Sequence, residues 1–274
     1  MPLSRTQVNE FLKSLESRMT LAVPKSSQDL KWGHREQTVT RLNAFWLQPK
    51  FQTWCSEPES TLRFVKGSYQ NRLQIKSFCL DFIKLMEDAS VPLLWALKPN
   101  ACEHTNGLSP ECLLSYLTVQ ALSVYLNQET TSGISEKQAA QIRKRFQSAS
   151  TLIDYIDLLC FSISVSRLLE VCILVDIHLL DARQQGFREH VELMKALSTA
   201  QSRLHNDGCR TMVKVLLASY GGIMFDEHES SDVMNNVILA GNSRHGKGKP
   251  VHRRREVGRL VSSHFGGRGR VYRS

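Results

Sequence analysis

The sequence predicts an α/β layer fold with a mainly parallel sheet of about five strands flanked by helices. Short apolar runs alternate along the chain with longer segments in which apolar residues recur every three to four positions, a pattern typical of parallel α/β sheets. In addition, residues 171–175 are apolar at every position, as expected of a strand covered on both faces. With 274 residues, of which 42% are hydrophobic, the chain can bury a substantial core.

The first segment is predicted to be helical. Within residues 4–20, apolar side chains fall on one helical face; these are Val8, Phe11, Leu12, Leu15 and Met19. A polar stretch follows, and a second helix is expected over about 36–48. The sequence SEPES at 56–60 then interrupts the pattern. We therefore assign residues 1–56 to a helical lead-in.

From residue 61 onward, strand and helix patterns alternate. The run TLRFVKG (61–67) predicts a strand that ends at Gly67, and helical periodicity from Ile75 to Met86 follows it. A second strand is predicted over 90–98, where Pro92 lies near the start and its missing N–H is tolerable. Three helices are expected next, over 108–126, 135–147 and 152–163. The first of them has Ser109 as a capping residue and Pro110 at its first position.

Three further strands complete the α/β pattern. The third covers 171–175 and runs directly into Asp176, and a helix from Phe187 to Leu197 follows it. The fourth and fifth strands are predicted over 212–222 and 235–241. Beyond Gly241 the apolar residues are too sparse for a core, so we predict a disordered tail with a short helix near 252–262. The α/β domain is thus assigned to 57–242 and the tail to 243–274.

The positive charge of the chain is concentrated in the tail. Of the 35 basic and 26 acidic residues, ten and one respectively lie within 241–274, which leaves 25 of each in residues 1–240. The body is therefore neutral, and any electrostatic attraction to a polyanion is a property of the tail.

Cysteine usage and hydropathy favour an intracellular protein. The seven cysteines are scattered and odd in number, as expected of reduced thiols rather than a disulfide framework. No stretch approaches the roughly 20 apolar residues of a membrane span, and the N-terminal residues lack the pattern of a secretory signal. We expect a cytoplasmic or nuclear location without membrane association.

The order of these segments resembles the P-loop ATPase core of the NACHT/STAND class, as found in fungal proteins. LRFVKGSYQNRLQIKS (62–77) lies at the place of the Walker A phosphate loop, and CILVDIHLLD (172–181) at that of the Walker B strand. VKVLLASYGG (213–222) lies at the place of the sensor strand. The resemblance covers residues 40–242 and rests on the order and hydrophobic pattern of the segments. It implies a P-loop ATPase-like fold that binds ATP and Mg²⁺, with Asp176 as the Walker B acid.

The motifs depart from a working ATPase at several positions. A phosphate loop needs G-x-x-x-x-G-K-[ST], because glycine N–H groups, a lysine and a hydroxyl hold the phosphates and Mg²⁺. Counting from Gly67, the second glycine, the lysine and the hydroxyl residue are replaced by Arg72, Leu73 and Gln74. The acid that should follow Asp176 is Ile177. We predict a degenerate site without catalytic residues.

The residues that could still contact a nucleotide are few. They are Lys66, Gly67, Asp176 and Asp181. Asp176 has a structural alternative, because an acid at a strand end often caps the following turn or pairs with a nearby arginine such as Arg183. Clustered zinc ligands and a nucleophile elbow are not found in the sequence, so we predict no metal site and no catalytic residues.

The tail carries a second candidate site. Arginine and lysine side chains bind phosphates, glycines keep the backbone flexible, and aromatic rings stack on bases. The candidate contacts to nucleic acid or an acidic partner are Lys247, Lys249, Arg253, Arg254, Arg255, Arg268 and Arg270. A nuclear import signal and a merely solubilising tail are the alternatives.

Three functional hypotheses follow. The first is a non-catalytic or weakly nucleotide-binding interaction or regulatory module of P-loop ATPase descent, without an obligatory cofactor and with protein partners, acting as an accessory component of a larger pathway. The second is a nucleic-acid-associated protein that binds through its tail. The third is a relaxed NTPase that uses Asp176 and Asp181.

Overall fold

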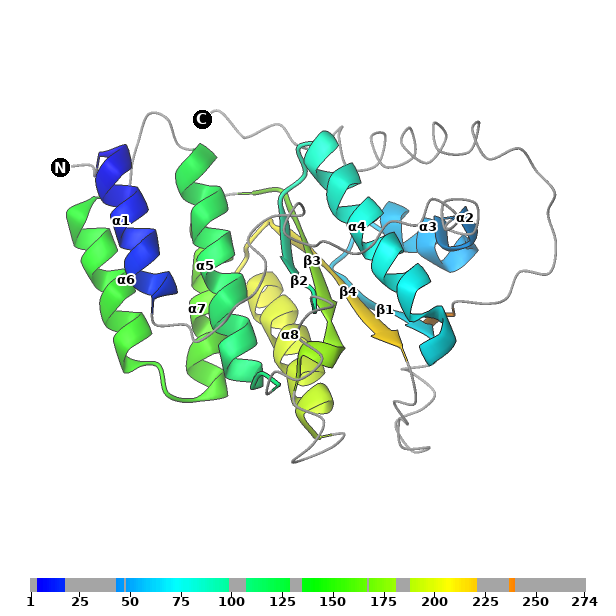
Figure 1. Ribbon diagram of the computed structural model, residues 1–274. Helices are drawn as coiled ribbons and strands as arrows, with labels where there is room; N and C mark the ends of the chain where they lie inside the picture. Colours follow the sequence, from blue (N-terminus) through cyan, green and yellow to red (C-terminus); the bar gives the residue numbers. More distant parts are fainter. Residues whose placement is uncertain are drawn as a thin grey trace. The chain divides into compact units, whose positions relative to one another are not determined.

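The structure is a computed structural model of the 274-residue chain (Figure 1). It describes residues 4–17, 43–46, 48–98, 107–128, 135–166, 168–180, 188–220 and 237–239. The described chain divides into two compact units, each assembled from segments that are distant in sequence. One unit comprises Met1–Ala22, Leu108–Leu168 and Glu189–Thr211, and the other comprises Val23–Gly107, Leu169–Arg188 and Met212–Ser274. We call them the helical unit and the sheet unit. The sequence-based division at residues 56 and 242 stays a prediction.

The sheet unit contains five parallel strands in the order β2-β3-β4-β1-β5. Their bounds are Thr61–Gly67 for β1, Leu93–Ala96 for β2, Glu170–Asp176 for β3, Met212–Tyr220 for β4 and Val237–Leu239 for β5. This confirms the predicted fold class, a parallel α/β sheet of about five strands compatible with a P-loop ATPase-like fold. Four strands lie within segments that were predicted from the sequence, and β3 extends its predicted segment by one residue at each end.

The strand order decides which strand ends are neighbours. Because β4 lies between β3 and β1, it separates the two strands whose ends were predicted, from the resemblance, to be the Walker B and Walker A positions. Gly67 of β1 is paired with Tyr220 of β4, and Asp176 of β3 is paired with Ala218. The order differs from the 3-2-1-4-5-6 and 2-1-3-4-5 orders of other nucleotide-binding α/β folds.

Side-chain burial explains why β3 and β4 form the centre of the sheet. Every residue of β3 is buried, and so is every residue of β4 after Met212. Such continuous burial requires cover on both faces, and their sequences EVCILVD and MVKVLLASY meet it with long apolar runs. The shorter strands β2 and β5 are the two edges of the sheet.

An aromatic core lies beside the sheet. The helices of this unit are α2 (Asn43–Trp46), α3 (Pro49–Ser56) and α4 (Arg72–Asp88), with 3₁₀ turns η2 (Tyr69–Asn71) and η4 (Ile177–Leu179). Trp46 lies 4.9 Å from Phe78 and 5.3 Å from Phe51 between ring centroids. The six apolar positions that predicted α4 are all buried, namely Ile75, Phe78, Cys79, Phe82, Ile83 and Met86. These contacts hold α3 and α4 against one core.

Helix α3 is an element that sequence analysis did not predict. Its eight residues begin with Pro49 at the first position, and they bury Phe51, Trp54 and Cys55. Periodicity over so short a segment is weak evidence, and burial against the aromatic core makes it helical.

The helical unit contains α1 (Arg5–Glu16), α5 (Pro110–Gln128), α6 (Glu136–Ser148), α7 (Leu152–Val165) and most of α8 (Arg188–Asn206). Four residues of α1 pack with α5 and α6 in one hydrophobic cluster: Val8, Phe11, Leu12 and Leu15. The predicted cap of α5 is confirmed, since the Ser109 hydroxyl accepts a hydrogen bond from the Cys112 N–H at 3.3 Å and Pro110 opens the helix. All five helices overlap segments predicted from helical periodicity.

Several predictions extend beyond the described ranges. Of the helix predicted over 36–48, the structure describes Asn43–Trp46 and Gln48, and Met19 is not described. The tail from residue 243 and its expected short helix also lie outside. Among the helices that the structure describes, none has the length and apolar character to cross a membrane.

Candidate functional site

The candidate site lies at the carboxyl edge of the sheet, where β1, β3 and β4 end. Parallel α/β sheets bind ligands at this edge, because loops and helix N-termini converge there. The strand ends bring together Gly67, Asp176 and Tyr220, two of which were predicted as site residues. Lys66, also predicted, is paired with Ser219 of β4 and Leu239 of β5.

Asp176 is buried, with 1% of its surface exposed, and its carboxylate is held by three protein donors. One oxygen, Oδ1, accepts a hydrogen bond from the His178 N–H at 3.0 Å. The other, Oδ2, accepts from the Tyr220 hydroxyl at 3.1 Å and from the Lys98 N–H at 3.4 Å. Asp176 is therefore the N-cap of the turn η4, which is the structural role that its position at a strand end also suggested.

Tyr220 and His178 form the next layer of this network. The Tyr220 N–H donates to His178 Nε2 at 2.9 Å, and the two rings stack with centroids 4.0 Å apart and planes 24° from parallel. Both main chain and side chain of Tyr220 are thus used to hold η4 and Asp176 in place. Sequence analysis did not single out these two residues, although His178 lies in the segment 172–181 and Tyr220 in the segment 213–222 that it compared with the Walker B and sensor strands.

Lys76 brings a positive charge to the same place. It lies one turn into α4 and is 8% exposed, and its ammonium Nζ is 5.6 Å from the centroid of the Tyr220 ring. Burial raises the pKa of Asp176, while the His178 N–H, the Lys76 charge and the Tyr220 hydroxyl lower it, so that the pKa is about 6. Burial and the neighbouring Asp176 charge both raise the pKa of Tyr220. We call Asp176, His178, Tyr220 and Lys76 the strand-end cluster.

The segment at the phosphate-loop position has a different structure from an anion-binding loop. After Gly67 the chain forms the turn η2 and enters α4 at Arg72. Tyr69 and Leu73 project into solvent with 60% and 53% of their surfaces exposed, and the Arg72 guanidinium lies 4.2 Å from the Tyr69 ring centroid. An apolar side chain stands where a phosphate loop places its lysine, so this segment offers little to a phosphate.

The described residues do not fit a magnesium ion at Asp176. Mg²⁺ requires near-octahedral oxygen ligands at close range, but both Asp176 oxygens already accept hydrogen bonds from protein donors. The positive charge of Lys76 also opposes a second cation. Within the described ranges, groups of three or more His, Cys, Asp or Glu side chains arranged to hold a metal ion are not found. Asp181 and the seven basic tail residues lie outside those ranges.

A second buried charge lies elsewhere in the sheet, near the amino ends of β3 and β4. Lys214 is 1% exposed, and its Nζ donates to the Cys55 carbonyl at 2.6 Å. It is also 3.6 Å from Glu170 Oε1 and 5.8 Å from the centroid of the Trp54 ring. Because Cys55 is near the end of α3, this lysine anchors that helix to the sheet, and its role is structural.

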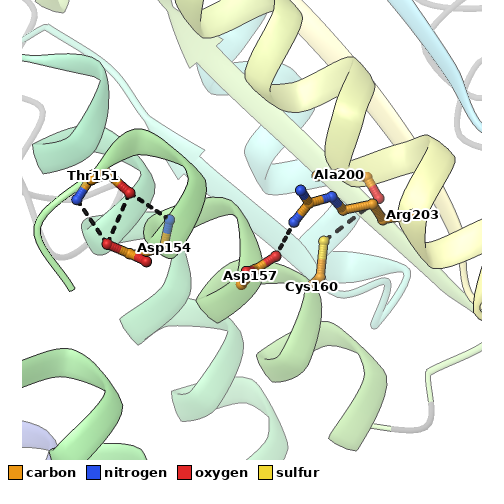
Figure 2. A network of polar contacts seen from close by, with 6 residues as sticks. All are labelled: Thr151, Asp154, Asp157, Cys160, Ala200 and Arg203. Atoms are coloured by element: carbon orange, nitrogen blue, oxygen red, sulfur yellow. Dashed lines mark hydrogen bonds and ion pairs between the residues drawn. The ribbon is translucent and has the colours of Figure 1, made fainter. Parts of the chain in front are cut away.

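The helical unit has polar contacts of a structural kind. Figure 2 shows Arg203 of α8 paired with Asp157 of α7, and the Cys160 thiol directed at the Ala200 carbonyl. At the start of α7, Thr151 and Asp154 exchange hydrogen bonds in a capping box (Figure 2). These side chains join and begin helices.

Comparison with protein-family models, with curated proteins and with solved structures finds no match for this chain. The class is therefore defined by fold and site alone. The sheet unit is an all-parallel α/β sheet of P-loop ATPase-like type whose carboxyl edge is occupied by an internal network of charged and aromatic side chains.

Proposed function

We propose that this protein is a non-catalytic interaction or regulatory module derived from a P-loop ATPase of the NACHT/STAND type. The observation that carries the proposal is the state of Asp176. In a hydrolase this carboxylate must reach a metal ion and its water, whereas here it is buried and serves as a hydrogen-bond acceptor for three protein groups. A carboxylate held in this way belongs to the internal hydrogen bonding of the fold and does not take part in phosphoryl transfer.

The segment after β1 supports the same proposal. Phosphoryl transfer depends on backbone N–H groups and a lysine that surround the phosphates. This chain has Arg72, Leu73 and Gln74 at the corresponding positions, and Leu73 is directed at solvent. Weak binding of an anion near Lys66 and the start of α4 is compatible with the proposal, but turnover is not.

The exposed residues at this edge favour a protein partner. Tyr69 and Leu73 are large apolar side chains in solvent, and the Arg72 guanidinium lies against the Tyr69 ring. Aromatic and arginine side chains are the types enriched in protein interfaces. This exposed surface supports the proposed accessory role in a larger assembly.

The test is calorimetric titration of the full chain with ATP and Mg²⁺, together with a phosphate-release assay. We expect no phosphate release above a no-protein blank and no heat that depends on Asp176. The Asp176→Ala variant is the matched control for any heat that is seen. Steady phosphate release by the native chain that this variant abolishes would overturn the proposal in favour of the relaxed NTPase.

The charge distribution favours a second candidate, nucleic-acid binding through the tail. Ten basic residues and one acidic residue lie within 241–274, and the rest of the chain is neutral. Binding driven by phosphate contacts weakens with salt in proportion to the counterions released. We expect homopolymer RNA to bind the full chain with a steep salt dependence that is lost when residues 242–274 are removed. An unchanged salt slope after truncation would reject this candidate.

A further inference from the structure

The strand-end cluster contains two buried charged groups, the Asp176 carboxylate and the Lys76 ammonium. A carboxylate and an ammonium are each costly to remove from water unless they are paired and hydrogen-bonded. Asp176 is almost fully buried, and Lys76 is one of the buried residues of α4. The Lys76 charge acts on Asp176, and its ammonium lies over the ring of the tyrosine that donates to Asp176.

We propose that Lys76 is an internal counter-ion of the Asp176 carboxylate and that, with Tyr220, it takes the place a divalent cation would have at this strand end. This inference rests on the proposed non-catalytic function and extends it by naming the residues that keep metal out. Lys76 and Tyr220 are positioning residues here, because each acts on Asp176 and neither acts on a ligand.

The geometry explains why a lysine suits this position better than a metal ion. The His178 and Lys98 N–H groups and the Tyr220 hydroxyl together use three of the roughly four acceptor sites of the carboxylate, which leaves little of it for a metal ion. The buried carboxylate then needs a positive charge nearby, but it needs no further hydrogen-bond donor or metal ligand. An ammonium on a flexible stem meets that need, and α4 supplies it as Lys76.

Tyr220 links the two charges. Its hydroxyl donates to Asp176 Oδ2 at 3.1 Å, and the centroid of its ring is 5.6 Å from Lys76 Nζ, within the range of a cation–π contact. Its ring also stacks on His178, which follows Asp176 in the turn η4. The side chain at the end of β4 thereby bridges α4 and β3.

A double-mutant cycle on the full chain tests the pairing. Lys76→Met removes the charge and keeps the length of the side chain, and Asp176→Asn removes the partner charge. We expect Lys76→Met to lower the folding equilibrium constant at neutral pH at least about tenfold in the native background, and by much less when Asp176→Asn is present. Lys76→Arg keeps a positive charge, so it should restore most of the loss. Equal effects of Lys76→Met in both backgrounds would overturn the inference.

A second measurement does not depend on the folding of a lysine variant. The unfolding temperature of the native chain should be the same with and without millimolar Mg²⁺ or Mn²⁺, since a bound cation would stabilise the folded state. A metal-dependent increase in the unfolding temperature that Asp176→Asn abolishes would show that Asp176 binds a cation, and it would overturn the counter-ion proposal. The phosphate-release assay distinguishes the two proposals. Metal binding without phosphate release would overturn only the proposal that Lys76 is the counter-ion. Phosphate release by the native chain would overturn the proposed non-catalytic function.

Discussion

At the scale of single residues, buried charges are placed by contacts between distant parts of the chain. Asp176 accepts from Lys98 and Tyr220, which are 78 and 44 residues away in sequence. Lys214 donates to Cys55 across 159 residues. Each of the two charges is hydrogen-bonded to protein groups and is acted on by an opposite charge, Lys76 for Asp176 and Glu170 for Lys214, and both networks join strands to helices of the sheet unit. Substitution of Asp176 or Lys214 should therefore change the stability of the folded protein and leave its surface largely unchanged.

Asp176 makes stability depend on pH in a defined window. Its pKa of about 6 in the folded state exceeds the ordinary value of 3.8, so the folded protein binds this proton more tightly than the unfolded chain. The contribution to stability is therefore full below about pH 4, falls as the pH rises to about 6, and is constant above that. At about 1.4 kcal/mol per pKa unit, the decline amounts to about 3 kcal/mol.

The measurement is urea unfolding of the native chain and Asp176→Asn across this window. We expect the difference in unfolding free energy between the two proteins to shift in favour of Asp176→Asn as the pH rises from about 4 to about 6. Asp154 does not interfere, because its lowered pKa gives a contribution that is lost only as the pH falls below 3.8. A difference that is independent of pH in this window would contradict the prediction.

Lys214 provides a second prediction at the residue scale. Lys214→Met removes the positive charge that lies 3.6 Å from the buried Glu170 carboxylate and also removes the bond to the Cys55 carbonyl, so we expect a loss of about 3–5 kcal/mol in unfolding free energy. Adding Glu170→Gln should recover much of that loss. Lys195→Met, on the exposed side of α8, is the control and should change stability by less than about 0.5 kcal/mol. If Glu170→Gln does not reduce the loss of unfolding free energy, then Lys214 does not act through Glu170 and the prediction is wrong.

At the scale of elements, helix starts are set by short-range side-chain bonds that can be read from the sequence. Ser4, Ser135 and Thr151 each begin a helix with a capping box, in which the residue three positions later returns a hydrogen bond. These bonds satisfy N–H groups that have no partner within the helix. They explain why α6 and α7 begin within one residue of the predicted positions.

The cap of α7 supplies the prediction at this scale. Thr151 Oγ1 accepts from the Asp154 N–H at 3.3 Å, and Asp154 Oδ2 accepts from the Thr151 N–H at 2.9 Å (Figure 2). Thr151→Ala should lower the unfolding free energy by about 1 kcal/mol, as measured by chemical denaturation. Thr199→Ala, within the exposed part of α8, is the matched control and should have little effect because alanine favours helix. Equal effects of the two substitutions would argue against the cap.

At the scale of the whole molecule, the parallel sheet and its aromatic core determine what solvent can reach. Cys79 and Cys172 lie in the core of the sheet unit, whereas Cys112 and Cys209 are partly exposed. Burial raises the pKa of the Cys79 and Cys172 thiols well above the ordinary value of 9.0. These core thiols can react only when the sheet unit opens.

Thiol labelling under native conditions checks this description. We expect Cys112 and Cys209 to be modified first, and Cys79 and Cys172 at least about a thousandfold more slowly, since their reaction requires opening of a stable domain. Mass spectrometry of peptides assigns each modification to a residue, and labelling in denaturant supplies the reference rate. Rapid modification of Cys79 in the native protein would show that α4 does not pack as described.

The sequence by itself determined where the strands and most of the helices lie, because periodicity and capping act over a few residues. It also showed that the segment after Gly67 lacks the G-x-x-x-x-G-K-[ST] motif, since that follows from residue identity at Arg72, Leu73 and Gln74. Only the tertiary structure decided the strand order, the helical conformation of α3, the grouping of α1 with α5 and α6, and the partners of Asp176. The physical reason is range: Lys76, Tyr220 and Lys98 meet Asp176 only after parallel strands have paired, and no local pattern records contacts that form across the sheet.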